Sequence, residues 1–151
     1  CGTFKQSYYV DHAERETILE TVDQRVKGQF DEVIIYSFDS ESGDGLLDLL
    51  PNSATKQTAL EYISDVLDVA KTQVVFCGDS GNDVYPLTAG FRGVLVRNAD
   101  EQLVAGVKQE LENNPDVVVY FARGGFRGLN GYYTGGVIEG AYHYGLFQDH
   151  D

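Results

Sequence analysis

One ten-residue segment carries the side chains best suited to chemistry. Residues 74–83 read VVFCGDSGND, an apolar run followed by two carboxylates, Asp79 and Asp83, four residues apart. Such a run is typical of a strand buried on both faces of a parallel sheet, and open α/β sheets bind ligands at the carboxyl ends of their strands. Carboxylate oxygens on a short, glycine-containing loop suit Mg²⁺, which commonly takes one or two carboxylates and completes its shell with water and phosphate oxygens. We interpret this loop as a metal site, although a plain turn and helix cap would use the same residue types.

Lys56 is the second candidate for chemistry. It stands at the start of a predicted helix that leads into the strand of residues 74–77. An ammonium group and the free amides of a helix N-terminus can hold one phosphate together. A lysine in this position is otherwise a solvated surface residue, so the neighbourhood of Lys56 decides between the two interpretations.

The first third of the chain predicts a small α+β unit. Strands are expected at residues 4–10, 32–37 and 46–50, where aromatic and β-branched residues concentrate. Asp11 and Glu14 have the spacing of a capping box, which would open a helix that ends at Gly28.

After Pro51 helices and strands alternate. A helix is expected from about Thr55 to Lys71, with an apolar stripe of Ala59, Leu60, Ile63, Val66, Leu67 and Ala70. The later elements are predicted as the strand 74–77, a short helix from Asn82, the strand 93–96, a helix opened by a capping box of Asn98 and Glu101, the strand 117–121 and a last helix at 137–147. This alternation predicts an α/β fold with a parallel sheet. We place the domain boundary between residues 1–54 and 55–151.

The composition narrows the classes of partner. The formal net charge is −13 over 151 residues, whereas nucleic acids and anionic membranes require a basic surface. No stretch approaches the length of a membrane span, so we expect a cytoplasmic protein without nucleic-acid or membrane partners. Any phosphate must be attracted locally, by a lysine, helix amides or a metal ion. The cysteines Cys1 and Cys77 form neither a disulfide framework nor a zinc site.

Several motifs together resemble a known family. The segments DLLPNSATKQTALEYI, VVFCGDSGNDVYPL and GVLVRNADEQL occur in this order. They are similar to the second half of sucrose-phosphate phosphatase, a magnesium-dependent phosphatase of the haloacid-dehalogenase (HAD) type. FKQSYYVD resembles part of that family's cap domain, and GGVIEGAYHYGLF resembles its C-terminal helix. The resemblance implies a HAD-like, three-layer Rossmannoid core, of which residues 55–151 are the C-terminal part, with residues 1–54 as a partial α+β cap.

The resemblance assigns roles around the phosphate. Lys56 would match the lysine that steadies the transferring phosphoryl group. Asp79 would ligate Mg²⁺, and Asp83 would support that coordination. Gln57 departs from the glycine that usually follows this lysine in the family.

The resemblance also implies contacts to the substrate. Asn82 would contact the phosphate, with Ser80 nearby, and Asn98 would help to shape the sugar side of the site. Residues 123–133 look like an insertion relative to the family. Six tyrosines have the chemistry to stack on a sugar ring, but aromatic side chains serve first as core and interface material: Tyr8, Tyr9, Tyr132, Tyr133, Tyr142 and Tyr144.

The main departure from the family concerns the nucleophile. The superfamily attacks phosphate with the first aspartate of a D-x-D motif at the end of the first core strand, and no D-x-D follows an apolar strand in these 151 residues. The nearest imitations are Asp39-Ser40-Glu41, which we interpret as a loop, and Asp149-His150-Asp151 at the end of the chain. In the family that first strand lies beside the strand ending at Cys77. We therefore expect an exposed sheet edge there, filled by a complementing N-terminal fragment, by a second copy or by a rearranged sheet.

Three functions remain open from the sequence. The chain is part of a sugar-phosphate phosphatase, a shortened relative that binds a sugar phosphate without hydrolysing it, or an interaction module that retains the motif. Sucrose 6-phosphate is the leading substrate. Phosphates of mannosylfructose, glucosylglycerol and glucosylglycerate are alternatives, because the cap selects the sugar and part of the cap is not found in these residues.

Overall fold

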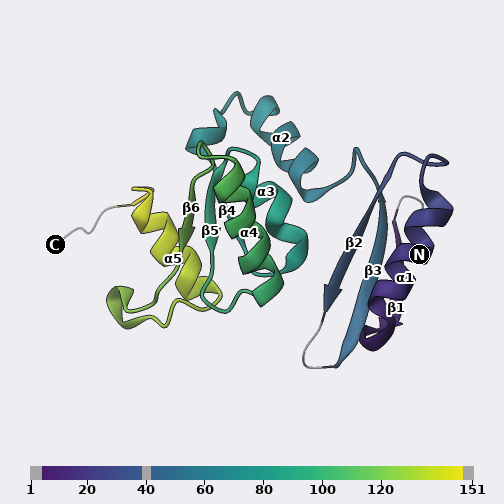
Figure 1. Ribbon diagram of the computed structural model, residues 1–151. Coiled ribbons are helices and arrows are strands. Elements are labelled where there is room, and N and C mark those ends of the chain that lie inside the picture. The colour runs from purple at the N-terminus through teal and green to yellow at the C-terminus, as the bar shows by residue number, and fades with distance from the viewer. Residues whose placement is uncertain (1–4, 39–41, 148–151) are drawn as a thin grey trace. The chain divides into compact units, whose positions relative to one another are not determined.

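The computed structural model describes residues 5–38 and 42–147 (Figure 1). Contacts divide the chain into two compact units, Cys1–Thr58 and Ala59–Asp151. The division falls inside a helix, Lys56–Val66. The interpretation of the first unit as a partial cap stays a prediction. None of the helices in the described residues is long and apolar enough to cross a membrane.

The first unit is a three-stranded antiparallel sheet with one helix. The sheet has the order β1-β3-β2, and its strands are β1 (Gln6–Asp11), β2 (Glu32–Phe38) and β3 (Asp44–Pro51). The helix α1 (Arg15–Val26) follows a single 3-10 turn, His12–Glu14. Asp11 accepts a hydrogen bond from the Ala13 amide at 2.9 Å and so caps that turn. The prediction that Asp11 and Glu14 form a capping box for the α-helix is therefore wrong. Asp11 caps the 3-10 turn, and the α-helix begins only after Glu14.

The second unit is built on a parallel sheet, as predicted. Its order is β4-β5-β6, and its strands are β4 (Val75–Gly78), β5 (Arg92–Leu95) and β6 (Val119–Phe121). The helices are α2 (Lys56–Val66), which begins in the first unit, α3 (Val84–Thr88), α4 (Glu101–Asn113) and α5 (Thr134–His143). Within the described residues β4 pairs only with β5, so its other edge has no strand partner there.

The two faces of β5 show why this unit has three layers. Alternate residues of a strand point to opposite faces. Leu95 packs with Leu87 of α3 and with Leu103 of α4 in the core cluster. Val94, on the other face, meets α5 so closely that a Cβ at Gly140 would lie 2.4 Å from a Val94 methyl. Glycine at this position lets α5 approach the sheet.

Helix α2 differs from the predicted helix in length and in the face that it buries. It ends at Val66 rather than at Lys71, because Asp68 takes a left-handed conformation with φ 51°. An amphipathic helix ordinarily packs its apolar stripe against a core. Here Val66 and Leu67 are 64% and 65% exposed, whereas Ser64 is buried. The described residues therefore leave the apolar stripe of α2 largely uncovered.

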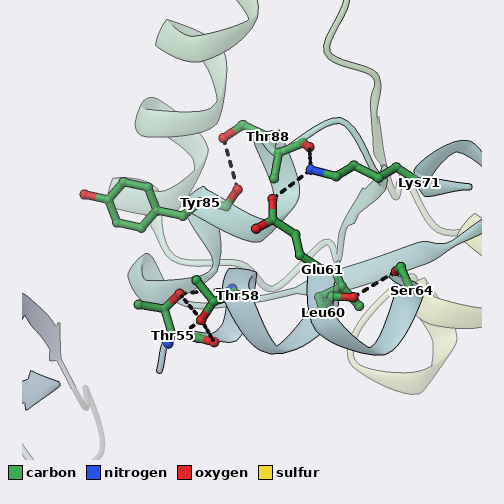
Figure 2. Close-up of polar contacts among 9 residues, drawn as sticks. Thr55, Thr58, Leu60, Glu61, Ser64, Lys71, Tyr85 and Thr88 are labelled. Carbon is green, nitrogen blue, oxygen red and sulfur yellow. Dashed lines mark hydrogen bonds and ion pairs between the residues drawn. The ribbon is translucent and has the colours of Figure 1, made fainter. Parts of the chain in front are cut away.

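Figure 2 shows what holds α2 in place. Thr55 and Thr58 cap each other's backbone amides, with amide nitrogen to Oγ distances of 2.9 and 3.1 Å. Further along, the Lys71 ammonium forms an ion pair with Glu61 at 2.7 Å and donates to the Ala89 carbonyl at 3.0 Å. These contacts link the body of α2 to the end of α3, within the second unit.

Candidate functional site

The loop after β4 brings four predicted site residues together. Asp79, Ser80, Asn82 and Asp83 lie within five residues that leave the carboxyl end of β4 and enter a 3-10 turn, Gly81–Asp83. The Ser80 hydroxyl lies 3.0 Å from the side-chain oxygen of Asn82. The short loop thus concentrates carboxylate, hydroxyl and amide groups at the sheet edge where parallel α/β folds bind ligands.

Asp83 organises this loop from the inside. Its side chain is 3% exposed, and its Oδ2 accepts hydrogen bonds from the amides of Asp79 and Ser80 at 3.1 and 3.3 Å. Gly78 makes room for it, since a Cβ at Gly78 would lie 2.6 Å from the Asp83 Cβ. Asp83 therefore sets the loop's shape through its Oδ2, and its support of a metal ion stays a prediction.

Asp79 is the carboxylate that faces solvent. Its backbone is held on both sides, because its amide donates to Asp83 and its carbonyl accepts from the Asp100 amide at 3.0 Å. Its side chain is exposed. A carboxylate on a fixed backbone at a strand end fits Mg²⁺, which often takes a single protein carboxylate.

The described residues contain no complete set of protein ligands for a metal ion. In residues 5–38 and 42–147, no three His, Cys, Asp or Glu side chains gather to hold a metal ion. Magnesium does not need such a cage when water and phosphate oxygens complete its shell. The exposed Asp79 carboxylate therefore fits a Mg²⁺ ion whose remaining ligands would be water and phosphate oxygens.

Asn98 is positioned by a different contact from the one predicted. It follows β5, and its Oδ1 accepts a hydrogen bond from the Tyr133 amide at 2.8 Å. The predicted capping box of Asn98 and Glu101 is wrong: Asp100 is the N-cap of α4 and accepts from the Leu103 amide at 2.6 Å. Asn98 is therefore committed to the segment before α5 rather than to α4.

Lys56 is the first residue of α2 and is exposed. By contacts it belongs to the first unit, whereas the loop of Asp79 belongs to the second. The approach of Lys56 to the phosphate thus stays a prediction. The imitations of the nucleophile motif, Asp39-Ser40-Glu41 and Asp149-His150-Asp151, lie outside the described residues.

Sequence reasoning missed Glu139, a buried carboxylate on α5. It is 5% exposed and accepts hydrogen bonds from the Tyr120 hydroxyl at 2.8 Å, the Arg123 amide at 2.8 Å and the Gly124 amide at 2.9 Å. Burial by itself would raise the pKa of Glu139, but these hydrogen bonds and the charge of Arg123 together lower it below the ordinary value of 4.5. Glu139 thus ties the segment that leaves β6 to α5.

Cys77 on β4 gives a simple test of the strand's packing. Burial raises the pKa of its thiol from 9.0 to about 11. The thiolate is the reactive form. Because the pKa of Cys77 is higher by about two, its thiolate fraction at neutral pH is about 100-fold smaller than that of a thiol of ordinary pKa, and alkylation is slower by the same factor. We expect this retardation in a Cys1→Ser variant treated with iodoacetamide, and expect it to vanish in urea. Fast alkylation of the folded chain would contradict the partial burial of Cys77.

Solved structures place this fold among HAD-type phosphatases. The sucrose-phosphatase of Synechocystis sp. PCC6803, solved in complex with sucrose and phosphate, aligns with 95% of this chain at a TM-score of 0.73 and 28% identity. The HAD subclass IIB sugar phosphatase BT4131 aligns with 95% of the chain at a TM-score of 0.63, and at 16% identity it supports the fold alone.

The sequence comparisons specify the family. The model of the sucrose-6F-phosphate phosphohydrolase family matches residues 1–145, and the chain therefore belongs to this family of the HAD superfamily. A HAD-like hydrolase of Nitrosococcus oceani is 38% identical over 143 residues, which are 93% of this chain and 38% of that protein. The mannosylfructose-phosphate phosphatase of Agrobacterium fabrum is 30% identical over 94% of this chain and 50% of its own length. The chain thus spans about half of these proteins or less, and 53% of the Synechocystis structure.

Proposed function

We propose that this chain contributes the metal-binding and phosphate-binding part of a phosphatase that hydrolyses sugar phosphate monoesters. The observation that carries the proposal is the exposed Asp79 carboxylate at the carboxyl end of β4, on a loop fixed by the buried Asp83. This arrangement occurs in a chain of the sucrose-6F-phosphate phosphohydrolase family.

Each polar residue of the loop has a part in the proposed reaction. Asp79 holds Mg²⁺, which would supply positive charge to the phosphoryl oxygens. Asp83 keeps the loop amides in place, and Asn82 with Ser80 binds the phosphate. Lys56 supplies a second positive charge near the transferring group, which matters because the chain as a whole, at −13, repels anions.

Sucrose 6-phosphate is the substrate that we propose first. The support is the family's own description and the Synechocystis relative, which was solved with sucrose and phosphate. The Agrobacterium relative acts on mannosylfructose phosphate, so that substrate is the second candidate. The reaction uses one water molecule to break the phosphate ester bond, and it releases the free sugar and inorganic phosphate.

Covalent catalysis would require a nucleophile that these 151 residues do not place after an apolar strand. We propose that a segment with an apolar strand ending in D-x-D pairs with the open edge of β4. Two features of the second unit support this occupant. The described residues provide β4 with a partner on one side only, and the stripe with Val66 and Leu67 is exposed instead of packed. Unpaired edges and uncovered apolar stripes are both surfaces that associate with other polypeptide.

A phosphate-release assay tests the proposed function. The 151-residue chain is incubated with sucrose 6-phosphate and Mg²⁺, alone and with a D-x-D segment taken from a sucrose-phosphatase. We expect turnover only with the segment and only without chelator. Turnover by the chain alone would mean that its own residues supply the nucleophile. No turnover with the bound segment would instead favour the alternative, a module that binds ligand or partner without catalysis.

The exposed stripe of α2 makes a separate prediction about association. Val66→Asp is expected to weaken binding of the D-x-D segment by about tenfold or more, because a charge would enter an apolar contact. The stability of the free chain should change by less than about 0.5 kcal/mol, since Val66 is 64% exposed. Isothermal titration calorimetry measures the first effect and urea unfolding the second.

Val118→Asp is the matched control, since Val118 is 55% exposed and precedes β6 at the other side of the sheet. If the Val66→Asp and Val118→Asp variants bound the D-x-D segment with equal affinity, this would contradict the proposal that the segment packs against the apolar stripe of α2. Self-association of the chain, lost in Val66→Asp, would identify a second copy as the occupant.

A further inference from the structure

A small cavity opens beside Asp79. Its volume is about 210 Å³, and it is lined by Cys77, Gly78, Asp79, Val96, Tyr133 and Val137. The wall thus combines the proposed metal ligand with residues from the end of β4, from the end of β5 and from the start of α5. All of these residues belong to the second unit, so the cavity is formed within one compact body.

Tyr133 occupies an unusual backbone position in this wall. Its φ and ψ are 45° and −125°. The Gly135 amide donates to the Tyr132 carbonyl at 2.8 Å and closes a four-residue turn around it. These angles match the second position of a type II′ turn, which glycine usually takes because a side chain there is strained.

The local contacts hold Tyr133 in this conformation without burying it. Its amide donates to Asn98 Oδ1 at 2.8 Å, and the Val137 amide donates to its carbonyl at 3.1 Å. The residue nonetheless remains 66% exposed. A strained residue with an exposed aromatic side chain gains little from core packing, and such residues concentrate at ligand sites.

We propose that Tyr133 is a specificity-determining residue that contacts the sugar part of a sugar phosphate whose phosphoryl group is held at Asp79. This inference rests on the proposed function and extends it from the phosphate to the leaving group. The ring offers an apolar face to the C–H groups of a sugar and a hydroxyl to its oxygens. Asn98 acts through Tyr133 as a positioning residue, because its side chain holds the Tyr133 amide.

Two ligands separate the sugar contact from the phosphate contact. The 151-residue chain in Mg²⁺ is titrated with inorganic phosphate and with sucrose 6-phosphate, and both affinities are measured by calorimetry. Tyr133→Gly removes the ring in a residue that accepts the same backbone angles without strain. We expect this variant to bind sucrose 6-phosphate about tenfold more weakly and phosphate equally well.

Two further variants make the result specific. Tyr133→Phe is expected to retain most of the affinity for sucrose 6-phosphate, because it retains the ring. Tyr132→Ala is the matched control, since Tyr132 is the adjacent exposed tyrosine and is not part of the cavity wall. Its affinities for both ligands should equal those of the unaltered chain.

Unchanged binding of sucrose 6-phosphate by Tyr133→Gly would overturn the role of Tyr133 while leaving the proposed function in place. Equal losses for phosphate and sucrose 6-phosphate would show a structural role and would also overturn it. An unaltered chain that binds neither ligand would contradict the proposed function itself.

Discussion

Asp79→Asn is expected to reduce magnesium-dependent phosphate release by about 1,000-fold or more in the chain supplied with a D-x-D segment. A metal ion stabilises transition-state charge by several kcal/mol, and each 1.4 kcal/mol changes the rate tenfold. Asparagine keeps the size of the side chain and removes the charge that Mg²⁺ requires. Because the Asp79 backbone is fixed by Asp83 and Asp100, the loop itself should survive the exchange.

The matched control for this variant is Asp116→Asn, since Asp116 is an exposed aspartate that follows α4. It loses the same charge from the same acidic chain and is expected to retain full activity. The rate at saturating Mg²⁺ shows whether Asp79→Asn only weakens the binding of Mg²⁺ or also lowers the rate once Mg²⁺ is bound. Equal activity of the Asp79→Asn and Asp116→Asn variants would remove Asp79 from the proposed centre.

Glu139→Ala is expected to destabilise the second unit by about 3–5 kcal/mol. Removing a buried, hydrogen-bonded carboxylate leaves the Tyr120 hydroxyl and two backbone amides without their acceptor. Urea unfolding followed by far-UV circular dichroism measures the loss. Glu112→Ala on the exposed face of α4 is the control and should change stability by less than about 0.5 kcal/mol.

The pH dependence gives an independent check on Glu139. Its pKa in the folded chain lies below the ordinary 4.5, so the ionised group stabilises the fold. This contribution is fully present above pH 4.5 and is lost as pH falls through the folded pKa. The stability difference between the unaltered chain and Glu139→Gln should therefore narrow below about pH 4.5. A difference that stays constant or widens on acidification would contradict the ionised, hydrogen-bonded carboxylate.

The parts of the fold that could be predicted from the sequence are those that depend on local pattern. The run VVFC followed by GDSGND predicts a buried strand and a polar loop because both signals lie within ten residues. The structure confirms a parallel sheet with β4 ending at this loop. The role of Asp83 as an acceptor for loop amides was not evident, since both aspartates of the motif have equal ligand chemistry.

Other features depended on competition between distant residues. Asn98 was predicted to cap α4, but Asp100 caps it and the Asn98 side chain instead accepts a hydrogen bond from the amide of Tyr133, 35 residues away in the chain. The glycines near α5 lower its helix propensity, yet the close approach of Gly140 to Val94 explains why they are compatible with a packed helix. Tyr133 in a position typical of glycine could not be anticipated from propensities.

The central claim is that the loop of residues 79–83 binds a divalent metal ion, and paramagnetic NMR tests it most directly. Mn²⁺, which also prefers oxygen ligands, is added in small amounts to the ¹⁵N-labelled chain in the presence of phosphate. The account predicts that amide signals from Asp79 to Asp83 broaden first, and that Asp79→Asn removes this effect. Broadening that spreads evenly over the acidic surface, or that survives in Asp79→Asn, would contradict it.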